Sequence, residues 1–153
     1  LQVLCSKCNR SKGNKDRTDF RGIEYVDQDK DCIFCGELSK KRIVAENNSV
    51  FAILDKYPLT DGHHLVIPYR HTDDFFTMTE TERNDALDLI RTLKNKIEQN
   101  DPTVVGFNVG ANCGEYAGQT VMHSHIHLVP RRKGDVEDPT GGIRGLIPDK
   151  MKY

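Results

Sequence analysis

Three of the six histidines of this 153-residue chain stand at alternate positions in one apolar run. The run extends from Gln119 to Pro130 and contains His123, His125 and His127. Successive side chains of an extended strand point to opposite faces, and each residue advances about 3.3 Å. The spacing therefore predicts a strand with three imidazoles on one face, about 7 Å apart. Imidazole can act as nucleophile, proton carrier or metal ligand. We interpret this face as a reaction centre rather than a merely solvated strand face.

Length and charge narrow the possible classes of protein. The chain has the length of about one domain, and its formal charge of −1 gives no overall argument for nucleic-acid or membrane binding. No apolar run approaches the roughly 18 residues of a membrane span, and no N-terminal targeting signal is recognisable. We therefore expect a soluble cytoplasmic protein that does not bind membranes. Four of the five cysteines form two Cys-x-x-Cys pairs, which favours metal ligation over disulfides.

The composition predicts three segments. Residues 1–22 are basic and show little apolar periodicity, so we interpret them as an arm and not as an independent domain. Residues 23–135 have the composition of a globular domain. Residues 136–153 turn to glycine, proline and charge, and Gly141, Gly142 and Pro148 predict an irregular tail.

The globular segment predicts an α+β fold with about five strands in a mainly antiparallel sheet, one long helix and a short helix. Thr79 followed by Glu82 is a capping-box signature, and apolar residues recur at helical spacing as far as Ile97. The long helix should end near Asn100, before Pro102. The expected strands lie at 42–46, 50–55, 64–67 and 104–109, followed by the histidine strand.

The histidine run closely resembles the motif of the histidine triad (HIT) family of nucleotide hydrolases and transferases. The resemblance covers about residues 31 to 135 and includes Phe51–Asp55 and Gly62–Pro68, which are similar to two upstream strands of the family. Ser124 departs from the motif, which usually has an apolar residue there. We expect Ser124 to face away from the imidazoles and to affect packing or dimer contacts. The resemblance implies a HIT-like fold and a homodimer built through the long helix and the fourth strand.

The resemblance also implies roles for individual side chains. His125 would attack the α-phosphate of a nucleotide and form a nucleotidyl-histidine that water hydrolyses, while His127 would donate to phosphate oxygens or to the leaving group. No catalytic metal is required if imidazole and amide groups meet the phosphate charge. Asp55 would accept the ribose hydroxyls, although it could equally initiate a turn. The phosphates would be contacted by Gln119, Thr120, Asn108 and His63.

The base is expected to be a purine, but its pocket is not defined by sequence. Four apolar residues could form its wall or belong to the core: Ile33, Phe34, Phe51 and Ile53.

A structural zinc site is the second prediction. Cys32 and Cys35 have zinc-knuckle spacing and need two further ligands. The family resemblance implies that His71 and His123 complete the site. The alternatives are a redox dithiol, a bare buried cysteine pair, or a catalytic zinc held by the three motif histidines. Cys113 has no partner in this scheme.

The first 13 residues resemble the closing segment of an HNH endonuclease. Cys5 and Cys8, followed by Asn9, match the end of its metal unit, but the preceding ligands are absent. We interpret this segment as a truncated remnant or as part of a longer fusion. Residues 5–21 could contact nucleic acid through their basic charge, although a solvated arm is the commoner outcome.

Two function classes follow. The first is a hydrolase that releases a nucleoside monophosphate, AMP in the simplest case, from a dinucleoside polyphosphate, a nucleoside phosphoramidate or an acyl-nucleotide. The Gly118–Val121 segment and the Pro130-Arg131 pair favour the dinucleoside polyphosphate branch of the family. The second is a nucleotidyltransferase, or a module that binds nucleotides or nucleic acid with little hydrolase activity.

Overall fold

A computed structural model of the chain describes residue 29, residues 31–147 and residues 149–151. The predicted basic arm, with Cys5, Cys8 and the HNH-like segment, lies outside these residues. In the described part, no helix is long and apolar enough to cross a membrane. The elements in chain order are α2 (Glu37–Lys40), β1 (Ile43–Glu46), β2 (Val50–Leu54), β3 (His64–Pro68), η2 (Phe75–Thr77), α3 (Glu80–Asn100), β4 (Val104–Gly110), η3 (Glu115–Ala117), β5 (Ile126–Arg132) and η4 (Gly142–Leu146).

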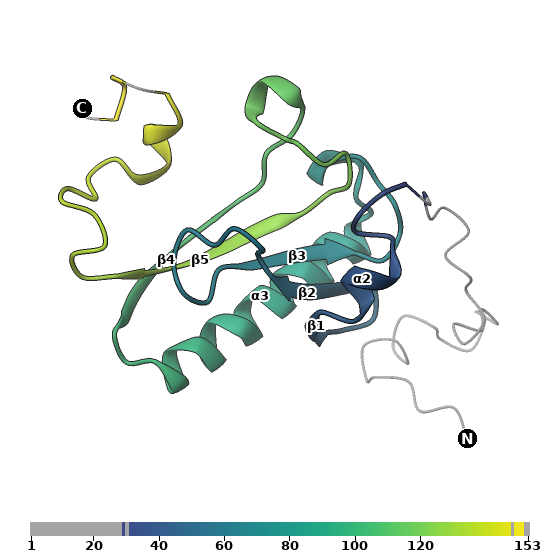
Figure 1. Cartoon of the computed structure of the whole chain (residues 1–153), viewed down its shortest axis with the longest axis horizontal. Helices are drawn as coiled ribbons and strands as arrows, with labels where there is room; N and C mark the ends of the chain where they lie inside the picture. Colours follow the sequence, from purple (N-terminus) through teal and green to yellow (C-terminus); the bar gives the residue numbers. More distant parts are fainter. Residues whose placement is uncertain (1–28, 30, 148, 152–153) are drawn as a thin grey trace.

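The five strands form one antiparallel sheet in the order β1-β2-β3-β5-β4. A tight turn joins β1 to β2, with the Asn47 amide donating to the Val50 carbonyl over 3.0 Å. The long helix α3 crosses the face of the sheet that lies away from the viewer in Figure 1. The predicted α+β architecture, with five strands and one long helix, is confirmed.

The ends of α3 follow from local side-chain chemistry. The Thr79 hydroxyl accepts from the Glu82 amide, and the Glu82 carboxylate accepts from the Thr79 amide, so two N-terminal donors are satisfied. Arg70 also donates to both carboxylate oxygens of Glu82, which ties the helix start to the loop after β3. The capping signature therefore predicted the correct start, and the helix ends at Asn100 as expected.

Alternating side chains divide the core between the two faces of the sheet. On one face Val50, Ala52 and Val66 pack against α3, together with Ile126 and Leu128. On the opposite face a second cluster is formed by Phe34, Phe51, Ile53, Leu65 and Ile67. The same alternation places His127, between Ile126 and Leu128, on the face away from α3.

The prediction that all three histidines line one strand is wrong. Strand β5 begins at Ile126, so of the three histidines it contains His127 alone. Residues 121–125 form bends and irregular backbone, and the Ser124 amide donates to the Thr72 carbonyl instead of to a neighbouring strand. The ladder between β3 and β5 stops at the Val66–Ile126 pair. Before Ile126 the described residues form no ladder with β3, yet His123 stays near the same face, where its ring packs edge-on against Phe34 with centroids 5.9 Å apart.

Within the predicted irregular tail, the described residues include one short helix. The 3₁₀ helix η4 forms at Gly142–Leu146, directly after Gly141 in the left-handed region at φ 90°. Glycine adopts this conformation without steric cost, so the residues that predicted irregularity permit a short turn instead. The tail lies near the end of the sheet that is distant from α2 (Figure 1).

Ser124 offers a test of packing. Its side chain is 2% exposed, and within the described part of the chain its hydroxyl has no hydrogen-bond partner. A buried hydroxyl without a partner costs about 1–3 kcal/mol. We expect Ser124→Ala to raise the free energy of unfolding by about 1 kcal/mol and the melting temperature by about 2–4 °C. Denaturant and thermal unfolding followed by circular dichroism would measure this, and a destabilised variant would contradict it.

Candidate functional site

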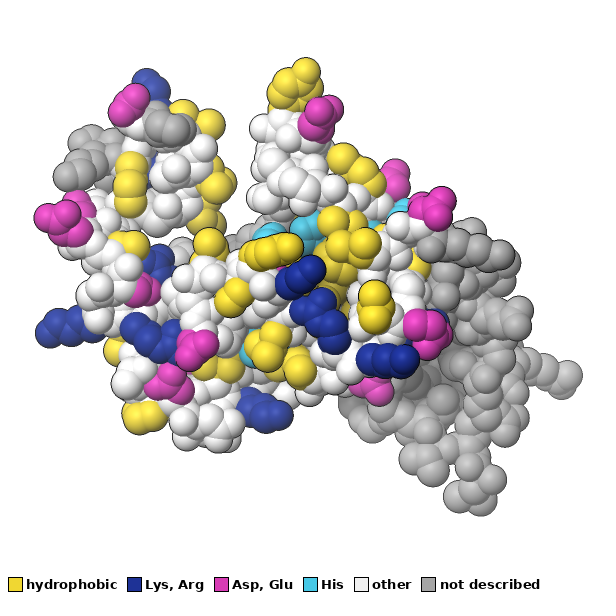
Figure 2. Space-filling model, viewed as in Figure 1, with side chains coloured by type: hydrophobic (Ala, Val, Ile, Leu, Met, Phe, Trp, Pro, Cys, Tyr) yellow, Lys and Arg dark blue, Asp and Glu magenta, His cyan; other side chains and the backbone are white. Residues whose placement is uncertain are grey.

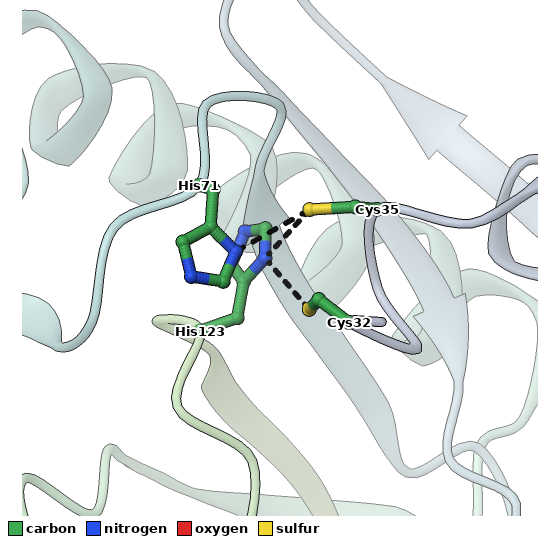
Figure 3. Close-up of side chains that lie close together, drawn as sticks. All are labelled: Cys32, Cys35, His71 and His123. Atoms are coloured by element: carbon green, nitrogen blue, oxygen red, sulfur yellow. Dashed lines mark hydrogen bonds between the residues drawn. The ribbon is translucent and has the colours of Figure 1, made fainter. Parts of the chain in front are cut away.

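Two cysteines and two histidines converge from three separate parts of the chain. Cys32 and Cys35 lie in the turn before α2, His71 lies in the loop after β3, and His123 precedes β5. The Cys32 Sγ is 3.4 Å from the His123 Nδ1, and the Cys35 Sγ is 3.4 Å from the His71 Nδ1 and 3.5 Å from the His123 Nδ1. Figure 3 shows both thiols directed at the two rings. All four ligand atoms lie within 4.8 Å of one another.

These distances fit a tetrahedral zinc ion. Zn–S bonds of about 2.3 Å and Zn–N bonds of about 2.0 Å place sulfur and nitrogen about 3.5 Å apart at a tetrahedral site. The donor set of two thiols and two imidazoles is one that structural zinc sites use. The turn that presents the thiols is itself held: the Cys35 amide donates to the Cys32 carbonyl, and the Ser39 hydroxyl donates to the Ile33 carbonyl.

The protonation states of His123 and Cys35 also bear on binding of a cation. The His123 Nε2–H donates to the Pro68 carbonyl over 2.9 Å, which leaves a lone pair on Nδ1 facing the thiols. Burial is the main cause that lowers the pKa of His123 to about 4, so the ring is neutral. Burial, followed by the neighbouring Cys32, raises the pKa of the Cys35 thiol to about 11. A bound cation would favour the thiolate and so offset this cost.

His125 is placed as a nucleophile would need to be. It lies two residues beyond His123, is 7% exposed, and its Nδ1–H donates to the His123 carbonyl over 2.8 Å. In the neutral ring this hydrogen bond leaves the lone pair on Nε2. The Phe34 ring packs edge-on against His125 with centroids 5.3 Å apart and restricts its rotation. The ring therefore has a defined tautomer and a defined direction.

His127 is paired with a second buried histidine. The His63 Nε2 lies 3.0 Å from the His127 Nδ1, and the rings of His125 and His127 are 5.2 Å apart. Burial, then the neighbouring His125 and His63, lower the pKa of His127 to about 4. Burial also lowers the pKa of His63. Both rings are thus neutral near pH 7, and they act through hydrogen bonds rather than through positive charge.

Asp55 makes the turn contact that its sequence position suggested, whereas its contact with ribose stays a prediction. Its Oδ1 accepts from the Tyr57 amide over 2.8 Å, as a turn-initiating aspartate does. Its Oδ2 lies 3.5 Å from the His63 Nδ1, so the carboxylate also borders the histidine pair.

The other predicted phosphate contacts differ in accessibility. The buried Gln119 amide donates to the Asp73 and Val121 carbonyls and accepts from the Gly114 amide, so it braces the loop before the motif. Thr120 is exposed. Asn108, on β4, accepts from Arg131 through its Oδ1 over 2.7 Å.

Of the four apolar residues considered for the base pocket, three belong to the core: Phe34, Phe51 and Ile53. Ile33 is 62% exposed beside the cysteine turn and remains the accessible candidate for a base contact. In Figure 2, small areas of histidine surface lie beside hydrophobic side chains in the upper middle of the molecule.

Comparison with known proteins places this geometry in a family. The model of the HIT domain matches residues 37–134, which include β1 to β5 and the histidine motif. The chain belongs to the HIT domain family. Proteins of this family are typically nucleotide hydrolases or transferases.

Two curated relatives illustrate the range of the HIT family. An uncharacterised HIT-like protein of Borreliella burgdorferi is 36% identical over 109 residues, which cover 69% of this chain and 78% of the relative. The AP-4-A phosphorylase of Mycobacterium tuberculosis is 37% identical over 117 residues, which cover 72% of this chain and 57% of the phosphorylase.

Solved HIT structures share the fold. A Zn-bound histidine triad family protein from Mycobacterium smegmatis superimposes with a TM-score of 0.64 at 32% identity, covering 71% of this chain and 80% of that protein. A HIT family protein from Bacillus anthracis gives a TM-score of 0.63 at 38% identity, covering 69% of this chain and 77% of that protein.

The alternative in which the three motif histidines hold one zinc ion does not agree with this HIT domain. His123 groups with the two thiols and His71, whereas His127 groups with His63 and Asp55; in the described residues His125 joins neither group.

Sequence reasoning missed the backbone groups of the site. The carbonyls of Pro68 and His123 set the tautomers of His123 and His125, and the Leu59 amide bonds to His63. No side-chain pattern identifies them, because every residue carries such groups.

Proposed function

We propose that this HIT protein transfers a nucleoside monophosphate from its substrate to His125 and then to water. The observation that carries the proposal is the hydrogen bond from the His125 Nδ1–H to the His123 carbonyl. It holds the Nε2 lone pair of the neutral ring in one direction, so that this nitrogen can attack a phosphorus atom.

The two steps balance as follows. The His125 Nε2 forms a bond to the α-phosphorus while the bond from that phosphorus to the leaving group breaks, and the bonding electrons depart with the leaving group. Water then attacks the same phosphorus while the bond from that phosphorus to Nε2 breaks; the bonding electrons return to Nε2, the attacking water gives up a proton to solvent, and the nucleoside monophosphate leaves. Donors around the phosphate, His127 and Thr120 among them, stabilise the developing charge.

The remaining substrate contacts are proposed from position. Asp55 accepts the ribose hydroxyls through its Oδ2, and His63 and Asn108 border the phosphates. Gln119 holds the loop from Gly114 to Val121, so we propose that it places the donors of this loop as well as contacting phosphate itself. The substrate is a purine nucleotide derivative: a dinucleoside polyphosphate or a nucleoside phosphoramidate.

A second candidate is a nucleotidyltransferase in which inorganic phosphate, not water, accepts the nucleotide from His125. The relative named AP-4-A phosphorylase favours this alternative. Water and phosphate attack the same intermediate, so the proposed role of His125 is the same in both reactions.

Product analysis separates the two. The zinc-loaded protein is incubated with diadenosine tetraphosphate, with and without inorganic phosphate, and the products are separated by ion-exchange chromatography. Release of AMP at equal rates in both samples supports hydrolysis. Phosphate-dependent ADP without AMP supports the transferase. Nucleotide binding without turnover of this compound or of an adenosine phosphoramidate would contradict both and favour a binding module.

We propose zinc as the ion that Cys32, Cys35, His71 and His123 hold, with a structural role. Bound zinc would join the turn before α2 to the loop after β3 and to the segment before β5. Free thiols are required for this, and the described cysteines are free, which supports a reducing compartment such as the cytoplasm.

We also propose that the domain is a homodimer. Strand β4 is one edge of the sheet, and beside it lies a cavity of about 450 Å³ with an apolar lining. Leu87 on α3 is 54% exposed and Val109 on β4 is 41% exposed at this cavity. A second copy, related by a two-fold axis, would cover both the cavity and the strand edge with the same surface.

If this surface is the dimer interface, a substitution in it should convert the dimer into a monomer. A charge at its centre meets an apolar surface, so we expect Val109→Glu to weaken dimerisation about 30-fold or more. The matched control is Val44→Glu on the opposite edge strand β1, where the side chain is similarly exposed, at 44%. Light scattering after gel filtration should show a dimer for the control and a monomer for Val109→Glu. A monomeric unmodified protein at tens of micromolar would refute the interface.

A further inference from the structure

The backbone amide of Leu59 determines which nitrogen of His63 carries the proton. This amide donates to the His63 Nδ1 over 3.2 Å, so Nδ1 must be an acceptor. Asp55 does not compete for the position: its Oδ2 is 3.5 Å from Nδ1 and makes no hydrogen bond with it. The proton of the neutral His63 ring therefore lies on Nε2.

That proton determines the state of His127 in turn. The His63 Nε2–H points at the His127 Nδ1 over 3.0 Å, so the His127 Nδ1 accepts. A neutral His127 then carries its own proton on Nε2. A doubly protonated His127 would place a second hydrogen between the rings. His63 could accept it only by moving its own proton to Nδ1, where the Leu59 amide hydrogen already points.

Among the described residues, His63 alone makes a hydrogen bond with the His127 Nδ1. Three titratable groups face its ring: His125, His63 and Asp55. His63 itself is 2% exposed and lies in the turn before β3, where the Thr60 carbonyl accepts from its backbone amide. His63 is thus shielded from water, whereas His127 is only partly buried.

We propose that His63 is a positioning residue that holds His127 as the neutral Nε2–H tautomer, and thereby directs a hydrogen-bond donor at the phosphate or leaving group. The claim about the tautomer concerns His127 alone. The claim about turnover rests on the proposed function. This role differs from a direct phosphate contact by His63, because the Nε2–H of His63 already donates its hydrogen bond to His127.

The tautomer can be observed without turnover. Nitrogen-15 NMR of the imidazole rings in the purified, metal-loaded protein at pH 7 should show both His63 and His127 in the Nε2–H form. In His63→Leu, His127 should become a mixture of tautomers. His63→Gln should restore the Nε2–H form, because the glutamine amide can donate from the position of the histidine Nε2. An Nδ1–H or imidazolium His127 in the unmodified protein would overturn the proposal.

In the kinetic experiment, the adjacent histidine serves as the control. His64 faces α3 on the other side of β3, and His64→Gln should leave the NMR pattern of His127 and the turnover unchanged. We expect His63→Leu to lower kcat about 100-fold while KM changes less than about 3-fold, and His63→Gln to recover most of the loss.

The outcomes separate the two proposals. The expected NMR pattern without any turnover would leave the positioning role standing and refute the hydrolase. A KM effect without a kcat effect, or no rescue by glutamine, would refute the positioning role even in an active protein.

Discussion

Replacing His125 by alanine is expected to abolish release of the nucleoside monophosphate, with turnover falling about 10⁴-fold or more. The imidazole is the one group in the proposed reaction that forms a bond to phosphorus, and alanine cannot substitute for it. Chromatographic analysis of AMP from diadenosine tetraphosphate, under the conditions that give linear release with the unmodified protein, measures the effect.

A trapped intermediate tests the same residue directly. After mixing with substrate and rapid denaturation in base, mass spectrometry should find the unmodified protein heavier by one nucleotidyl group, and His125→Ala without it. The matched control is His64→Ala, a histidine equally buried on the other face of the sheet, which should keep both signals. His125→Ala should still bind nucleotide with a Kd within a few-fold of the unmodified protein. Turnover by His125→Ala close to the unmodified rate would eliminate the proposed nucleophile.

Removing one ligand of the zinc site is the second large expected effect. At free zinc one thousand times its Kd, binding stabilises the native state by about 4 kcal/mol. For a chain of this size that corresponds to a fall of about 10 °C in melting temperature when Cys32→Ser releases the metal. Elemental analysis and calorimetry measure the zinc content and the melting temperature.

The control for this experiment is Cys113→Ser. Cys113 is also a free, half-buried thiol, but it lies outside the cluster of ligands, so zinc content and melting temperature should be unchanged. One zinc ion per chain retained in Cys32→Ser, with an unaltered melting temperature, would argue against Cys32 as a ligand. Chelation of the unmodified protein should reproduce the effect of Cys32→Ser, because both remove the same link between β3, β5 and the turn before α2.

Local sequence patterns were sufficient for most of the fold. The capping pair Thr79 and Glu82 predicted the start of α3, since a cap is formed by residues three positions apart. The short apolar runs at 50–55 and 64–67 predicted strands, and β2 and β3 form there. These features depend on side chains that are neighbours in the chain, so the chain order alone reveals them.

The histidine run shows where local reasoning fails. Its alternation predicted one strand with three rings on one face, but the strand begins at Ile126 because the ladder with β3 ends there. The length of a ladder depends on the partner strand and on contacts such as the one from Ser124 to Thr72, which no pattern within the run contains.

The sequence by itself determined the type of fold, the family resemblance and the chemical groups available. Only the tertiary structure decided how those groups combine. It brings Cys32 to His123 across 91 positions and sets the Leu59 amide against His63. The physical reason is that a tautomer or a ligand set depends on distances of about 3 Å between groups far apart in the chain, and such distances are set by the packing of the whole domain.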